Sequence, residues 1–97
     1  MENGSIVIRQ QYTRLFFEIY CEQKSIIPYG IDLATSIIQD GLEFNSRTSN
    51  EYFEASKISF YAFNVSFSLE FINEKKLNNF INYLRSNGFQ IDAESQL

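Results

Sequence analysis

The stretch that decides the fold runs from residue 63 to residue 88 and reads FNVSFSLEFINEKKLNNFINYLRSNG. Its first nine residues alternate between apolar and polar side chains, which is typical of a β-strand with one buried face. From Leu77 onwards the apolar residues recur at three- and four-residue spacing, which predicts an amphipathic helix. The chain therefore combines strands and helices rather than belonging to the all-α or all-β classes.

Both ends of this helix carry recognisable signals. Asn73 is a good N-cap residue, and the pair Ile72 and Leu77 has the spacing of a hydrophobic staple around it. At the other end Gly88 suits the left-handed residue of a Schellman ending, with Phe89 placed to fold back on the last turn. The sequence predicts a helix over 73–87.

A second helix is predicted over 31–39, where the apolar residues again follow helical spacing and Gly41 follows as a stop. The apolar positions are Ile31, Leu33, Ala34, Ile37 and Ile38. Asp40 in its last turn opposes the helix dipole. Residues 42–44 then alternate briefly and 45–50 are rich in turn formers, which indicates a strand, a turn and a return strand.

Residues 5–22 fit both periods. As a helix, the segment gathers Ile8, Tyr12 and Leu15 on one side. As a strand, its residues alternate between the two faces, and its content of β-branched and aromatic residues is high. We interpret 13–22 as a strand.

With a short last strand at 89–91, the element order becomes β-α-β-β-α-β over a single domain, 1–97. This is the ferredoxin-like arrangement, a small α+β sandwich in which two helices lie on one face of an antiparallel sheet. If 5–22 is helical instead, the order becomes ααββα. One domain is expected because a chain of 97 residues is close to the common size of one.

Charge and composition exclude several classes of function. The net charge is −4, and each half of the chain holds four Lys or Arg against six Asp or Glu, so no basic region exists for direct binding of DNA or RNA. No run of residues is apolar for long enough to span a membrane, and no secretory signal is recognisable at Met1. The single Cys21 fits a reducing compartment. We expect a soluble, cytoplasmic protein.

Residues for conventional catalysis are missing. The chain has no histidine, which excludes Ser-His-Asp and Cys-His pairs as well as His-based metal sites. One cysteine cannot build a structural zinc site, and Cys21 stands among apolar neighbours that suit a buried side chain. We predict no enzyme, no cofactor and no metal. A carboxylate-dependent enzyme using Glu18, Glu22 or Asp32 ranks last among the hypotheses.

Surplus aromatic residues point to binding. Sixteen per cent of the chain is aromatic, and Tyr52, Phe53, Phe60 and Tyr61 fall on both sides of the predicted return strands. Because helices cover only one face of such a sheet, aromatic residues on the other face need another cover. We predict a protein-interaction module, such as an inhibitor, an immunity protein or an accessory or regulatory subunit, which binds another protein or itself through these four residues. The alternative is a homodimeric domain that senses a small molecule.

Overall fold

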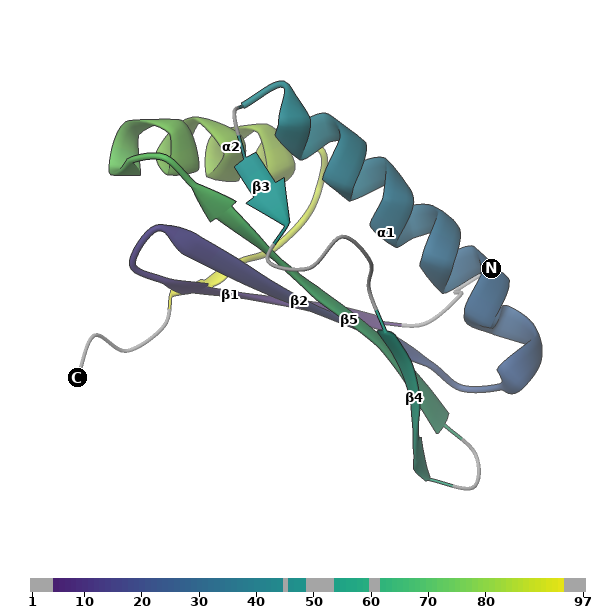
Figure 1. Cartoon of the computed structure of the whole chain (residues 1–97). Coiled ribbons are helices and arrows are strands. Elements are labelled where there is room, and N and C mark those ends of the chain that lie inside the picture. Colours follow the sequence, from purple (N-terminus) through teal and green to yellow (C-terminus); the bar gives the residue numbers. More distant parts are fainter. Residues whose placement is uncertain (1–4, 45, 49–53, 60–61, 94–97) are drawn as a thin grey trace.

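The computed structural model describes residues 5–44, 46–48, 54–59 and 62–93 (Figure 1). The strands of this part are β1 Ser5–Gln11, β2 Arg14–Cys21, β3 Ser46–Thr48, β4 Glu54–Ser59, β5 Ala62–Phe71 and β6 Asp92–Ala93. The helices are α1 Ile27–Leu42 and α2 Glu74–Ser86, with a short 3-10 helix, η1, at Lys24–Ile26. Both helices lie on the same face of one sheet, which confirms an α+β domain (Figure 1).

The sheet follows the order β3-β5-β2-β1-β6, and β4 pairs with β5 beside β3. β3 pairs with the last residues of β5, whereas β4 pairs with its first half. The pairs are antiparallel except for β6, which runs parallel to β1. Since β2 and β4 are both antiparallel to β5, the unit β2-α1-β4 is a split βαβ with β5 between its two strands.

The helical alternative for 5–22 is wrong, because this segment is the antiparallel hairpin of β1 and β2. The interpretation of 13–22 as a strand agrees with β2. The hairpin turn is made possible by Tyr12, whose φ of 56° lies in the left-handed region that reverses the chain. The ferredoxin-like order is not confirmed, since β1 is an additional strand and lies between β2 and β6.

The strand and helix of the deciding stretch form as predicted. Asn73 caps α2 by accepting a hydrogen bond from the Lys76 backbone N–H at 2.9 Å. At the C-terminus Gly88 adopts a φ of 92°, and the Phe89 N–H donates to the Leu84 carbonyl at 3.1 Å. These bonds satisfy backbone groups that the helix itself leaves unpaired, which explains why the ends of α2 could be read from the sequence.

The bounds of α1 and its neighbours differ from the predicted ones. α1 begins at Ile27 because Pro28 is accommodated in the first turn, where its missing N–H costs nothing. Gly41 is not a stop but a helical residue, and residues 42–44 are not a strand, because α1 continues through Leu42. The short strand that follows is β3. The last strand is β6, Asp92–Ala93, rather than the predicted 89–91.

The hydrophobic core fills the space between the sheet and the two helices. β2 alternates strictly between partly buried and buried residues, and its buried side chains face the helices. The larger of two clusters joins β1, β2, α1, β5 and α2, and the smaller one lies under the first half of α1. Fully buried members include Phe17, Leu69, Leu77 and Phe80. This core holds the sheet in one register and so fixes the residues on its opposite face.

A hydrogen bond between side chains joins the two helices outside this core. The Tyr83 hydroxyl on α2 donates to Asp40 Oδ2 on α1 at 2.9 Å. The bond stabilises the neutral phenol, and together with burial and the carboxylate charge it raises the pKa of Tyr83 above its ordinary value. The unfavourable position of Asp40 near the end of α1 is thus accompanied by a specific bond to the other helix.

Ionisation of Tyr83 is expected to weaken the fold at high pH. Because the pKa is higher in the folded state, the contribution of this bond is complete below the ordinary tyrosine pKa of about 10 and is lost as pH rises through the folded value. In a spectrophotometric titration of the tyrosines, Tyr83→Phe should lack part of the phenolate absorbance change that the parent protein shows at the highest pH values. The stability difference between Tyr83→Phe and the parent should also shrink above about pH 10.

Tyr29→Phe is the matched control, since Tyr29 is 57% exposed on α1. An unchanged alkaline end in Tyr83→Phe would contradict the assignment of a raised pKa to this residue.

Candidate docking face

The four aromatic residues predicted to bind a partner, Tyr52, Phe53, Phe60 and Tyr61, lie outside the described residues. Their role stays a prediction. Within the described residues, both helices lie on one face of the sheet and leave the opposite face of β1, β2 and β5 without a helix (Figure 1).

We call this surface the open face and define it by the residues of β1, β2 and β5 that alternate with the core residues. Neighbouring residues of the three strands lie in register on this face. Gln11 lies beside Arg14 and Glu70, and Arg9 lies beside Phe16 and Ser68. Val7 lies beside Glu18 and Ser66, and Tyr20 lies beside Asn64, which is buried. The open face therefore mixes aromatic, cationic and anionic side chains.

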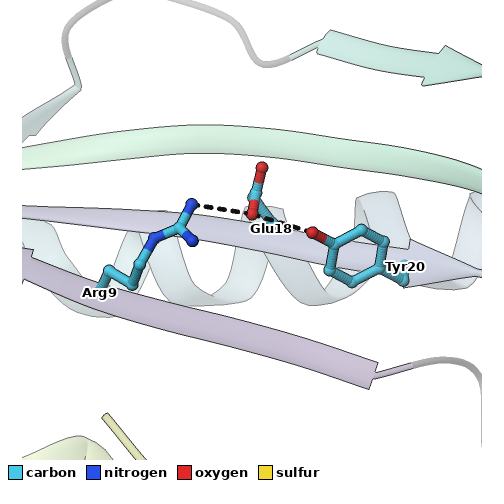
Figure 2. A network of polar contacts seen from close by, with 3 residues as sticks. All are labelled: Arg9, Glu18 and Tyr20. Atoms are coloured by element: carbon cyan, nitrogen blue, oxygen red, sulfur yellow. Dashed lines mark hydrogen bonds and ion pairs between the residues drawn. The ribbon is translucent and has the colours of Figure 1, made fainter. Parts of the chain in front are cut away.

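Arg9, Glu18 and Tyr20 form a hydrogen-bonded network on the open face (Figure 2). Arg9 Nη2 donates to Glu18 Oε1 at 3.0 Å, and the Tyr20 hydroxyl donates to the same oxygen at 3.0 Å. The bond to Glu18, followed by burial and the carboxylate charge, raises the pKa of Tyr20 above its ordinary value. Glu18 is thus held in one position between β1 and its own strand.

A second ion pair joins β2 to β5 at the hairpin end of the sheet. Arg14 Nε donates to Glu70 Oε1 at 2.7 Å, and the Thr13 hydroxyl donates to Glu70 Oε2 at 2.6 Å. Both charged side chains are about two-fifths exposed, at 40% and 39%. Pairs with such access to water stabilise a fold by only about 0.2–1 kcal/mol, so their main effect is to orient the side chains.

Phe16 lies between these two polar groups. Its register neighbour on β1 is Arg9, and the guanidinium carbon of Arg14 lies 5.9 Å from the centre of its ring. That distance is within the range of a cation–π interaction. Aromatic and arginine side chains are the types most enriched where proteins bind one another, so this arrangement suits recognition of a protein surface.

The carboxylates proposed for catalysis do not converge. Glu18 belongs to the open face, whereas Asp32 is an exposed residue of α1, which covers the opposite face. Glu22 is exposed just beyond the end of β2. The geometry therefore brings together no pair of these three groups for acid–base chemistry.

Cys21 is buried, as the sequence indicated. It is 1% exposed and packs in the smaller core cluster with Ile19, Ala34 and Val65. Burial raises the pKa of the Cys21 thiol, which opposes formation of the reactive thiolate. In this protein the residue acts as a small apolar side chain.

Two features are absent from the described residues, a candidate metal site and a membrane-spanning helix. Within this part of the chain, three or more His, Cys, Asp or Glu side chains nowhere group so as to hold a metal ion. Neither α1 nor α2 is long and apolar enough to cross a membrane.

The described part of the chain is a small α+β domain with one sheet face covered by two helices and one face that neither helix covers. Comparisons of the chain with protein-family models, with curated proteins and with solved structures find no match.

Proposed function

We propose that this domain is a non-enzymatic protein-interaction module that binds a protein partner on its open face, as an inhibitor, an immunity protein or an accessory subunit does. The observation that supports it is Phe16, an aromatic side chain flanked by Arg9 and Arg14 on a sheet face that neither helix covers. Aromatic anchors surrounded by polar groups are the usual centres of binding energy in protein interfaces.

The two ion pairs support the same proposal. Arg9 and Arg14 are held by carboxylates of the same chain, so a partner meets side chains that are already ordered. Ordering before contact lowers the entropic cost of binding. The balance of charge also fits a protein partner better than a nucleic acid, because each arginine has a neighbouring carboxylate that repels phosphate.

A cytoplasmic location and the contribution of Tyr52, Phe53, Phe60 and Tyr61 belong to this proposal. The sensing of a small molecule by a homodimer stays a prediction from sequence, with no described group of side chains that favours it.

Photo-crosslinking in the cells that make the protein tests the proposal. A benzophenone-bearing phenylalanine analogue replaces Phe16 in one variant and Thr35, an exposed residue of α1, in the control. We expect a discrete protein adduct from position 16, lost when Arg14→Glu is added, and none from position 35. Equal adduct patterns at both positions, or none at either, would overturn the proposed function.

A further inference from the structure

The open-face residues of β2 read Arg14, Phe16, Glu18, so a cation and an anion stand two residues to either side of an aromatic ring. Two residues of a strand span about 7 Å. Arg14 and Glu18 therefore lie at similar distances on either side of Phe16 and carry opposite charges, so the surface can complement a copy of itself.

A two-fold interface must be self-complementary. If one residue of the first copy contacts another residue of the second copy, the symmetry repeats that contact with the two copies exchanged. Consider a two-fold axis that lies in the plane between two open faces, runs perpendicular to β2 and passes the two Phe16 residues. It sets the two β2 strands antiparallel and places one Phe16 ring against the other. It also places Arg14 of each copy opposite Glu18 of the other copy. The alternative axis, parallel to β2, would set Arg14 against Arg14.

Both members of this cross-copy pair retain hydrogen-bonding capacity. Arg14 uses Nε for Glu70, which leaves its terminal nitrogens without a hydrogen bond among the described residues. Glu18 receives both of its bonds at Oε1, and Figure 2 shows its other oxygen directed away from Arg9 and Tyr20. The guanidinium and the carboxylate are thus held in place by intrachain bonds while a donor and an acceptor remain available.

The charges of this face permit self-association. The whole chain carries −4, so two copies repel each other in general. Within the open face, Arg9 and Arg14 balance Glu18 and Glu70. About this axis each Arg14 meets Glu18 of the other copy, and the two Arg9 side chains, each bonded to Glu18 of its own chain, face each other.

We propose that the protein partner of the open face is a second copy of this chain, bound with its sheet against this one about a two-fold axis at Phe16. This inference rests on the proposed function and names its partner. Sheets that pack face to face lie about 10 Å apart, which brings Phe16 and its flanking charges of both copies into contact.

Complementary charge reversal tests the pairing. Sedimentation and light scattering of the parent protein should show a mass that rises with concentration towards twice 11.4 kDa. Arg14→Glu leaves only acidic groups at both positions and Glu18→Arg only basic ones, so each variant alone should dimerise at least ~10-fold more weakly. An equimolar mixture of the two variants should dimerise again, because every cross-copy pair then joins opposite charges.

Phe16→Ser is the second variant, and it should be monomeric while it keeps the circular dichroism spectrum of the parent. Melting curves of all variants check that they are folded. A parent protein that stays monomeric at every concentration, or a mixture that dimerises no better than its components, would overturn self-association. If such a monomer still crosslinks from position 16 to a different protein, the proposed function survives; if it crosslinks to nothing, both proposals fail.

Discussion

Replacing Phe80 with alanine is expected to lower the free energy of unfolding by about 3–5 kcal/mol. Phe80 is fully buried on α2, and its ring centre lies 5.1 Å from that of Phe44, 5.3 Å from that of Phe71 and 5.8 Å from that of Tyr83. It therefore joins α2 to the end of β5 and to the turn after α1. Alanine at position 80 removes the contacts with all three neighbouring rings. The cavity that remains persists because these closely packed rings relax only partially to fill it.

Urea denaturation followed by circular dichroism measures this loss. Domains of this size are stable by about 5–15 kcal/mol, so Phe80→Ala should shift the midpoint strongly and leave little folded protein in moderate urea. Asn79→Ala is the matched control, since Asn79 is the exposed neighbour on the same helix, and its effect should stay within about 0.5 kcal/mol. A loss below about 1 kcal/mol in Phe80→Ala would contradict the packing described for α2.

Local signals made the second half of the chain predictable from sequence. β5 has strict two-residue alternation, and α2 has an N-cap, a helical apolar stripe and a glycine after its last turn. Each signal acts within a few residues and agrees with the others. The tertiary structure did not need to be known to read them.

The first half shows where such reasoning fails. The turn between β1 and β2 contains Tyr12 and Thr13 rather than the Asn-Gly or Gly-Gly that usually marks a hairpin. Gly41 looked like a helix stop but lies where a side chain would meet Ser46 Oγ at 2.5 Å. Contacts with β5 accompany both features: the Phe71 N–H donates to the Thr13 carbonyl at 2.9 Å, and a side chain at position 41 would also lie 3.0 Å from Leu69 Cδ1, contacts that no local pattern records.

The open face was predictable only in part. Once β2 is taken as a strand, its alternation puts Arg14, Phe16, Glu18 and Tyr20 on one side. The partners of these residues depend on register: Arg9 reaches Glu18 across nine positions of sequence, and Arg14 reaches Glu70 across 56. Only pairing of the strands brings these charges together, so no local pattern of sequence predicts them.

Close approach of α1 to the sheet predicts a second large effect, at Gly30. A Cβ atom at this position would lie 2.9 Å from Cys21 Sγ and 3.4 Å from Val65 Cγ2. Gly30→Ala should therefore lower the free energy of unfolding by about 1–3 kcal/mol through overpacking, less the ~0.5–1 kcal/mol that alanine contributes as a better helix former. Ser36→Ala, at an exposed position of the same helix, isolates the effect of helix propensity.

The double variant Gly30→Ala/Cys21→Ala decides whether the contact with Cys21 is the cause. Cys21→Ala alone leaves a small cavity under α1, but in the double variant the new methyl group occupies space that the sulfur has vacated. The two losses should then fall short of additivity by about 0.5–3 kcal/mol in urea denaturation, as expected for residues in direct contact. Additive losses would mean that α1 rests on the sheet further from Cys21 than described, and that the first turn of α1 can move aside without cost to the core.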